Sequence, residues 1–139
     1  MYLLDTHVLS ELRKVQARKT DKHVAQWAAS VDASALFVSS SSLMELGVLA
    51  MERKDPAQGQ LLRTWLERRV LPEFKDRTLP VDTAVALRCA RLQVPDRRSE
   101  RDALIAATAL AHSMTVVTGN KPEFEPTGVS SLNPWEWTR

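Results

Sequence analysis

Short apolar runs alternate along the chain with longer stretches whose apolar residues recur at helical spacing. A short run bounded by polar residues is typical of a buried strand, and recurrence every three or four residues is typical of a helix packed on one side. Strands are therefore predicted at residues 2–4, 35–38, 78–82, 115–118 and 129–132. Because helical stretches separate these runs, the pattern predicts the α/β class, with a central, mostly parallel sheet of about four to five short strands flanked by helices.

Helices are predicted wherever an apolar stripe lies between two strands. The first follows Asp5 directly, the second has Thr20 or Asp21 as its cap, and the most apolar one spans residues 102–112 and is expected to be buried centrally. Loops are predicted at residues 13–20, 94–99 and 119–124, which are polar or rich in turn residues. The apolar stripes that predict the helices comprise Val8, Leu9 and Leu12; Val24, Trp27, Ala28 and Val31; Val85, Leu87, Cys89 and Leu92; and most of residues 102–112.

The middle of the chain predicts a helical hairpin. Ser42 and Glu45 have the spacing of a capping box, so a helix is expected to start there and to end before Pro56. Pro56 itself suits the first position of the next helix, because its missing N–H would have no partner there. The hairpin, residues 42–71, is expected to stand off the sheet. Its apolar surface, including Trp65, can then either pack on its own domain or contact another chain, and the same two alternatives hold for Trp27.

Composition places the chain among ordinary globular proteins. It has 139 residues, of which 44% are hydrophobic and 26% charged, so one domain with one core is expected. No apolar run is long enough to cross a bilayer, and no signal peptide is visible. Cys89 is the only cysteine and cannot form an internal disulfide. It is expected to be a buried small apolar residue in a reducing compartment.

The net charge of +2 does not by itself indicate a nucleic-acid ligand. The basic residues are nevertheless clustered, and such clusters either neutralise phosphates or form solvated helix faces and loops. The sequence leaves both interpretations open. The clusters comprise Arg13, Lys14, Arg18 and Lys19 near the start, and Arg88, Arg91, Arg97, Arg98 and Arg101 later in the chain.

Four acids from separate segments stand where polar residues follow strands or begin helices. Asp5 ends the first strand, Glu45 and Asp102 lie near helix starts, and Glu123 lies in the loop after the fourth strand. Each has a simpler explanation as a helix cap, a first-turn acid or a solvated loop acid. Parallel strands, however, bring their carboxyl ends to one edge of the sheet. Carboxylates gathered there repel one another unless a cation is present.

Oxygen ligands of this kind suit Mg²⁺ or Mn²⁺ rather than Zn²⁺. The three histidines, His7, His23 and His112, form no zinc-ligand pattern with Cys89. The sequence also contains no Walker-type phosphate loop and no nucleophilic Ser or Cys elbow. A carboxylate-based phosphatase commonly needs a second Asp two residues after its nucleophile, and His7 occupies that position here.

Four stretches of the sequence form a pattern of their own. They are residues 3–12 (LLDTHVLSEL), 42–46 (SLMEL), 102–109 (DALIAATA) and 115–120 (TVVTGN). Together they closely resemble the PIN domain, and more narrowly the VapC-type ribonuclease toxins of type II toxin–antitoxin systems. The resemblance extends over residues 1–139 as a single PIN domain, with the motifs in the family's order.

The resemblance assigns roles to individual residues. Four acids form its catalytic set, with metal ligation resting chiefly on the first and third. Polar residues that line or support the site match Thr6, Thr118 and Asn120. The four acids match Asp5, Glu45, Asp102 and Glu123, so the metal ligands are expected to be Asp5 and Asp102.

The sequence departs from the family pattern at several positions. Gly119 stands where the family commonly has Arg, which removes a potential phosphate contact, and Glu123 stands where Asp is usual. Gly47 follows Glu45 by two residues instead of three, which affects the expected helix register. Ser40 and Ser41 replace apolar strand residues, so the second strand is expected to be short.

The resemblance implies a Mg²⁺-dependent endoribonuclease, with Mn²⁺ as a possible substitute, that acts as a toxin. It would hydrolyse RNA phosphodiesters with a metal-activated water and leave 5′-phosphate and 3′-hydroxyl ends. A homodimer, a cognate VapB-like antitoxin and an RNA substrate are the expected partners, in the cytoplasm. The alternative is a catalytically weak or inactive PIN-like module that acts through its antitoxin or by binding nucleic acid. Removing Asp5 or Asp102 is expected to abolish cleavage and to leave the fold as stable or more stable.

Overall fold

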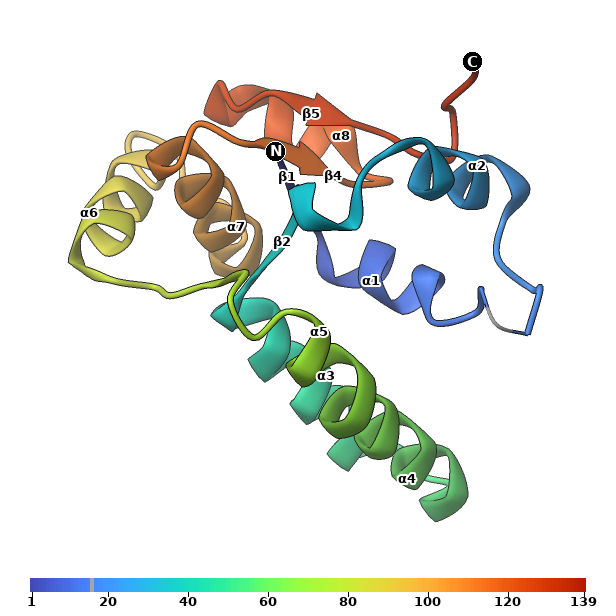
Figure 1. The fold of residues 1–139 in the computed structure, drawn as a ribbon. Helices are drawn as coiled ribbons and strands as arrows, with labels where there is room; N and C mark the ends of the chain where they lie inside the picture. The colour runs from blue at the N-terminus through green and yellow to red at the C-terminus, as the bar shows by residue number, and fades with distance from the viewer. Residues whose placement is uncertain (16) are drawn as a thin grey trace.

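The computed structural model describes residues 1–15 and 17–139; Gln16, within the predicted loop 13–20, lies outside the described residues. In the described part, all strand pairings are parallel and form one five-stranded sheet in the order β3-β2-β1-β4-β5 (Figure 1). The α/β class and the parallel sheet predicted from the sequence are confirmed. The strands are β1 (Tyr2–Leu4), β2 (Leu36–Ser39), β3 (Thr78–Leu79), β4 (Thr115–Val117) and β5 (Ser131–Leu132).

Helices connect the strands and cover both faces of the sheet. Each long helix begins at a side-chain cap, and Asp21 and Asp82 are the caps of α2 and α6. The helices are α1 (Thr6–Leu12), α2 (Lys22–Ser30), α3 (Ser40–Glu52), α4 (Pro56–Trp65), α5 (Leu71–Glu73), α6 (Thr83–Leu92), α7 (Glu100–Ala111) and α8 (Lys121–Phe124), with short helical turns η1 (Ala33–Ala35), η2 (Leu66–Val70, π-helical) and η3 (Glu125–Thr127).

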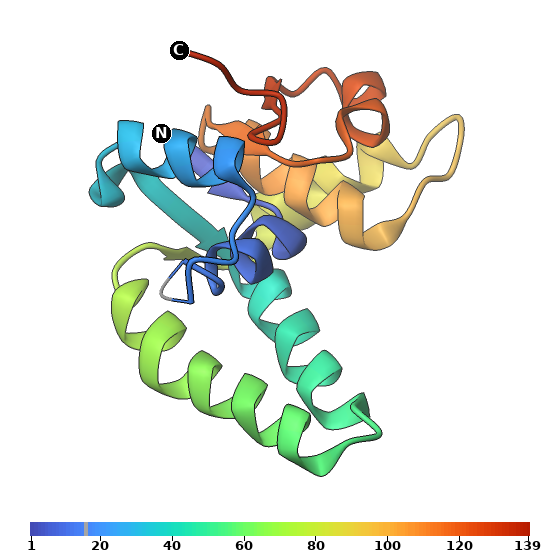
Figure 2. The same cartoon turned by 90° about the vertical axis from the view of Figure 1, so that its right-hand side faces the viewer.

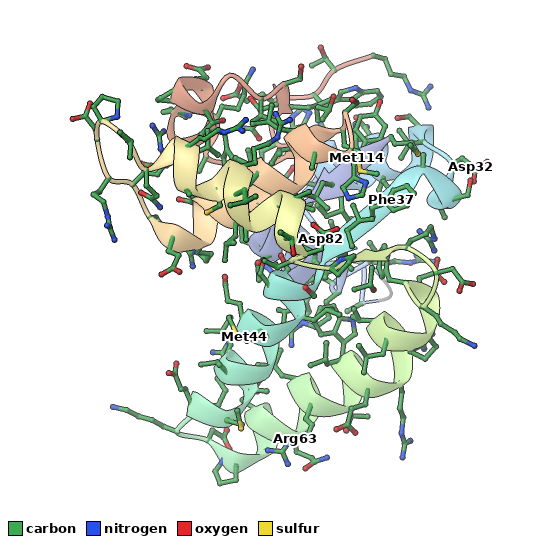
Figure 3. All side chains as sticks on the ribbon, turned by 90° about the vertical axis from the view of Figure 1, so that its left-hand side faces the viewer. Asp32, Phe37, Met44, Arg63, Asp82 and Met114 are labelled. Carbon is green, nitrogen blue, oxygen red and sulfur yellow. The ribbon has the colours of Figure 1, made fainter. Side chains whose placement is uncertain are left out.

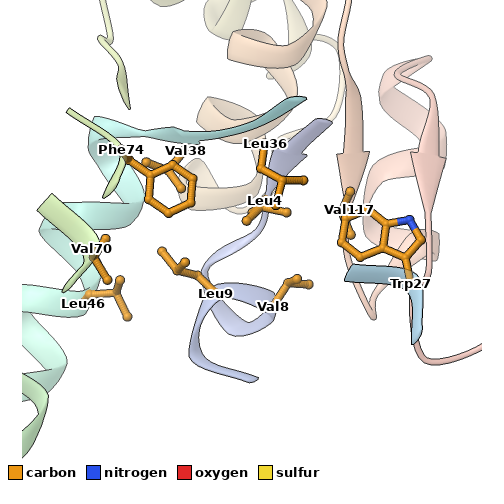
Figure 4. Close-up of a cluster of buried hydrophobic side chains, with 10 residues drawn as sticks. All are labelled: Leu4, Val8, Leu9, Trp27, Leu36, Val38, Leu46, Val70, Phe74 and Val117. Carbon is orange, nitrogen blue, oxygen red and sulfur yellow. The ribbon is translucent and has the colours of Figure 1, made fainter. Parts of the chain in front are cut away.

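The two faces of the sheet have separate cores because neighbouring strand residues point to opposite sides. On one side Leu4 and Val117 pack with α1, α2, α3 and the end of the hairpin (Figure 4). On the other side Leu3 and Val116 pack with α7 and α8. Strands buried on both faces read as uninterrupted apolar runs, which is the pattern that the sequence shows.

The buried positions confirm two predictions and decide between the two roles that the sequence left open for Trp27. Helix α7 is central, with Ile105 and its alanine neighbours fully buried, and Cys89 is a buried residue packed between α6 and α7. Trp27 is only 1% exposed and packs against Tyr2, so its role is in the core and it is not a contact surface. The reason is that α2 lies directly on the sheet.

The helical hairpin is confirmed, and Figure 2 shows it projecting away from the sheet. Its first helix starts earlier than predicted. Ser39, not Ser42, is the cap of α3, and its Oγ accepts a hydrogen bond from the backbone N–H of Ser41. The capping-box interpretation of Ser42 and Glu45 is therefore wrong. β2 runs directly into α3 at Ser40, so no loop is available to place the start at Ser42.

The segment after β4 differs from its prediction in one respect. The predicted loop at residues 119–124 contains the short helix α8, which buries Phe124 against the α7 side of the sheet.

The hairpin leaves large apolar side chains exposed, among them Met44 at 65% and Leu61 at 60%. Figure 3 shows Met44 and Arg63 on the hairpin. In the described residues no helix is both long and apolar enough to cross a membrane.

Candidate active site

Asp5 lies at the point where β1 ends and α1 begins. Its backbone N–H continues the sheet by donating to the carbonyl oxygen of Val117 at 2.9 Å, and its side chain caps α1. The functional and the capping interpretations of Asp5 are therefore compatible. Parallel pairing of Leu4 with Val117 places Asp5 beside Thr118, at the carboxyl edge of the sheet.

The carboxylate of Asp5 is held by three groups. Oδ1 accepts from the Thr6 backbone N–H at 2.8 Å, and Oδ2 accepts from Thr118 Oγ1 at 2.8 Å and lies 3.2 Å from His7 Nδ1. Burial alone would raise the pKa of Asp5, but the contacts with His7, Thr118 and Thr6 outweigh burial and hold this pKa below its usual value. Asp5 is therefore an ionised carboxylate in a fixed orientation. The expectation that removing Asp5 leaves the fold as stable or more stable stays a prediction, in which the loss of these contacts opposes the relief of repulsion with Asp102.

His7 connects Asp5 to the C-terminal segment. The backbone N–H of Gly119 donates to His7 Nε2 at 2.9 Å, and Trp135 stacks on the imidazole ring. Because Nε2 accepts this hydrogen bond, the ring carries its proton on Nδ1, which faces Asp5. A Cβ atom on Gly119 would lie 2.9 Å from Trp135 Cζ3 and 3.1 Å from His7 Nε2. Glycine is thus required at position 119, because Trp135 and His7 lie too close to its Cα for a side chain.

Asp102 comes from the first turn of α7, where Ser99 is the cap. Burial raises the pKa of its carboxyl, and the negative charges of Asp5 and Glu123 raise it further, whereas Arg101 and His7 lower it. The net effect is a raised pKa for Asp102, whereas the pKa of Asp5 is lowered. A buried carboxyl next to a second carboxylate is the arrangement in which a bound cation gains most.

Glu45 is paired with a cation from its own chain. Arg101 Nη1 donates to Glu45 Oε1 at 3.2 Å and Oε2 at 3.4 Å, and Arg101 Nε lies 3.9 Å from Asp102 Oδ1. Arg101 thus sits between two of the four acids. The sequence placed Arg101 only in a basic cluster, because nothing local shows that it meets Glu45 across 56 positions.

Asp5, Glu45, Asp102 and their neighbours line one cavity of about 190 Å³. Of the residues that the sequence singled out, Asp5, Thr6, Glu45, Asp102 and Asn120 reach it. Thr118 lies beneath, fully buried, and Glu123 on α8 is exposed and acts on Asp102 only through its charge. The remaining lining residues are His7, Ser10, Leu49 and Arg101.

Hydroxyl groups tie the floor of the cavity to the hairpin. Thr6 Oγ1 donates to Ser42 Oγ at 3.0 Å, which joins α1 to the first turn of α3. Thr118 Oγ1 accepts from the backbone N–H of Asn120 at 3.0 Å and so orients the loop that brings Asn120 to the cavity. Thr6, Ser42 and Thr118 are all buried.

The oxygen donors suit a small divalent ion, although they do not surround one. Among the described residues, no three His, Cys, Asp or Glu side chains gather in a geometry that could hold a metal. Mg²⁺ is often held by one or two carboxylates, with water and substrate phosphate completing its octahedron. Asp5 and Asp102 at one cavity fit that mode. Glu45, bonded to Arg101, and the exposed Glu123 do not stand with them as free ligands.

The chain belongs to the PIN domain family, whose model matches residues 2–125. Within that family it is a toxin of the VapC and FitB type, as the following relatives indicate. The plasmid stability protein StbB of Pseudomonas syringae pv. tomato is 36% identical, with 98% of this chain and 99% of that protein covered. The VapC ribonuclease Y4jK of Sinorhizobium fredii is 34% identical over the same shares.

A third relative and a solved structure that resembles this chain both come from Neisseria gonorrhoeae. Toxin FitB of Neisseria gonorrhoeae is 31% identical, with 97% of this chain and 99% of that protein covered. The crystal structure of FitAcB from Neisseria gonorrhoeae matches with a TM-score of 0.88 at 30% identity, covering 99% of this chain and 100% of that one. The fold and the family predicted from the sequence are confirmed.

Proposed function

We propose that this chain is a divalent-metal-dependent endoribonuclease and the toxin of a toxin–antitoxin pair. The observation that carries the proposal is the pairing of Asp5 and Asp102 at one cavity with opposite pKa shifts. Helix capping and a first-turn position explain each carboxylate separately, but burying two of them at one cavity costs desolvation that a bound cation would offset. The names of two relatives support the two parts of the proposal. VapC ribonuclease Y4jK supports RNA cleavage, and Toxin FitB supports the role of a toxin.

The chain's own groups position the reaction. Asp5, fixed by Thr6, Thr118 and His7, and Asp102 would hold the metal, Mg²⁺ or Mn²⁺, with Glu45 and Glu123 assisting. The ion supplies positive charge that activates water and stabilises charge developing on the phosphate. Thr6 and Asn120 present polar groups at the cavity. In the proposed hydrolysis, the oxygen of water bonds to phosphorus, the bond from phosphorus to the 3′ oxygen breaks, and a proton passes to that oxygen.

Purified protein incubated with structured RNAs tests the activity. Cleavage is expected with Mg²⁺ or Mn²⁺, is expected to stop with excess EDTA, and should leave 5′-phosphate and 3′-hydroxyl ends on sequencing. Asp5→Asn and Asp102→Asn each should lower the rate by about a hundredfold or more. RNA binding without cleavage in either metal would favour the alternative, a binding module, which the pairing of Glu45 with Arg101 supports.

The partner surface that fits an antitoxin is a groove beside the catalytic cavity. It has a volume of about 330 Å³ and shares His7, Ser10 and Leu49 with that cavity. Trp65 and Leu62 give it an apolar wall from α4, as expected for the hairpin. A segment of a cognate, VapB-like antitoxin lying there would also cover the catalytic cavity. We propose a homodimer in the cytoplasm as the form that this antitoxin inhibits.

Co-purification tests the assembly. A cognate antitoxin co-expressed with the wild-type chain should co-purify with it and suppress its RNase activity. Trp65→Ala should weaken that binding, whereas Arg97→Gln, far from the groove, should not. Size-exclusion chromatography with light scattering measures the oligomeric state, and a monomer at micromolar concentration would contradict the proposed dimer.

A further inference from the structure

Arg101 occupies an unfavourable position for a cation. It lies in the first turn of α7, where the helix dipole favours negative charge. Its side chain is 63% exposed, so its ion pair with Glu45 is largely hydrated. Exposed ion pairs of this kind add little stability. The stability of the fold therefore does not account for an arginine at the rim of the cavity.

The guanidinium of Arg101, which lines the cavity, retains N–H donors without a hydrogen-bond partner among the described residues. Arginine has five N–H donors in a rigid planar fork. Only Nη1 donates within the described residues, to the two oxygens of Glu45, while Nε is 3.9 Å from Asp102, beyond hydrogen-bond distance. A planar fork with free donors matches the oxygen geometry of a phosphodiester.

No other side chain lining the cavity supplies a permanent positive charge. Its remaining basic group is His7, whose two ring nitrogens are already engaged, Nε2 with the backbone N–H of Gly119 and Nδ1 with Asp5. Position 119, next to the lining residue Asn120, cannot carry a cationic side chain, because Trp135 and His7 fill the space. A phosphate entering between Asp5 and Asp102 thus meets one positive side chain, that of Arg101.

We propose that Arg101 binds the scissile phosphate through its free guanidinium donors, and that its pairing with Glu45 holds it in place before the RNA arrives. The inference rests on the proposed ribonuclease function. It assigns Glu45 a second role, as the positioning residue for Arg101. The contact neutralises charge on the phosphate as the bond to the 3′ oxygen breaks.

The test measures RNA binding and metal binding separately. Arg101→Gln, Arg101→Lys and the control Arg97→Gln are compared with wild type; Arg97 is exposed and outside the cavity, and the control removes the same charge. A fluorescein-labelled single-stranded RNA is titrated in EDTA at several salt concentrations. Mn²⁺ binding is measured without RNA by calorimetry, and thermal unfolding confirms that each variant folds.

Arg101→Gln is expected to weaken RNA binding by about tenfold or more, as for loss of a charged hydrogen bond. The slope of log affinity against log salt should fall by about 0.7, the value for one phosphate contact on a single strand. Mn²⁺ should bind Arg101→Gln as well as or better than wild type, since a positive charge has left the acids. Arg101→Lys should recover part of the affinity, and Arg97→Gln should match wild type within about twofold.

Each remaining outcome decides against one of the two proposals. Unchanged affinity and salt slope in Arg101→Gln, or no measurable RNA binding by wild type, overturns the assignment of Arg101. Cleavage by Arg101→Gln at the wild-type rate overturns it as well and leaves the ribonuclease function standing. If wild type never cleaves but Arg101→Gln loses RNA affinity and salt dependence, the ribonuclease function fails and the phosphate contact stands.

Discussion

The indole of Trp135 stacks on the imidazole of His7, with ring centroids 5.4 Å apart and ring planes inclined by 18°. The contact joins the C-terminal segment to the first helix, and Nδ1 of the stacked His7 lies 3.2 Å from the carboxylate of Asp5. Gly119 lies in the same contact and donates its backbone N–H to His7. The absence of an arginine at this position, a departure from the family pattern, therefore has a steric cause in this chain.

Gly119→Ala is expected to disturb the site and the fold together. The new Cβ would lie 2.9 Å and 3.0 Å from two atoms of Trp135, so the ring stack must shift. Overpacking of this kind costs about 1–3 kcal/mol of unfolding free energy. The loss should appear in urea unfolding and as a lower rate of RNA cleavage.

Gly47→Ala is the matched control for that substitution. It lies within α3, and no heavy atom would come within 4 Å of its new Cβ. Alanine should therefore raise the unfolding free energy by about 0.5–1 kcal/mol, the usual gain in a helix interior. Equal effects of the two substitutions would refute the close packing of Gly119 against the ring stack.

Asp102→Asn should change stability in a pH-dependent way. Burial and the charge of Asp5 raise the pKa of Asp102 in the folded state, so the folded protein binds its proton more readily than the unfolded chain does. Wild-type stability therefore falls as pH rises from the unfolded pKa through the folded one. Relative to wild type, Asp102→Asn should gain stability over that interval, measured by urea unfolding at a series of pH values that starts below the ordinary pKa of an aspartate, about 3.9.

Asp5→Asn should show the opposite sign and serves as the comparison. The contacts of Asp5 with His7, Thr118 and Thr6 hold its pKa below the unfolded value despite burial. Its stabilising contribution is present above the unfolded pKa and is lost as pH falls through the folded one. Asp5→Asn should thus be less stable than wild type at pH 7 and approach it in acid. The same trend for both variants would contradict the opposite shifts.

Much of the fold was predictable because its signals are local. The three central strands, β1, β2 and β4, are short, mainly apolar and mostly buried runs. Asp21, Asp82 and Pro56 mark helix starts by their own chemistry. The site was predictable only in part. Asp5 and Asp102 stand out as acids at strand and helix ends, but the pairing of Arg101 with Glu45 joins distant segments and leaves no local pattern.

The start of α3 shows why local chemistry can be insufficient. Ser39, Ser40, Ser41 and Ser42 are all suitable caps, and Glu45 completes a capping box only with Ser42. The parallel pairing of β2 with β3 continues to Ser39, and this tertiary contact selects the cap. Ser42 is then free to accept the hydroxyl of Thr6 within the buried floor of the site.

A double-mutant cycle should separate the roles of the two serines. Ser39→Ala removes the cap of α3 and should cost about 0.5–2 kcal/mol of unfolding free energy. Thr6→Val and Ser42→Ala break one hydrogen bond between them and should couple by about 0.5–1.5 kcal/mol. Thr6→Val and Ser39→Ala share no contact and should be additive. Coupling of Thr6 to Ser39 instead of Ser42 would contradict the assignment of Ser39 as the cap of α3. It would favour the capping box of Ser42 and Glu45.

The hairpin offers a last test, in which a substitution normally favourable in helices should do harm. Gly59 of α4 packs against α3, and a Cβ there would lie 2.7 Å from the backbone carbonyl oxygen of Ala50. A backbone atom cannot turn aside as a side chain can, so the helices must separate. Gly59→Ala should lower the unfolding free energy by about 1–3 kcal/mol, whereas helix propensity alone would raise it by about 1 kcal/mol. A stabilised Gly59→Ala variant in urea unfolding would show that α3 and α4 are not packed this closely in solution, and the groove walled by Leu62 and Trp65 would then lack a fixed shape for a partner.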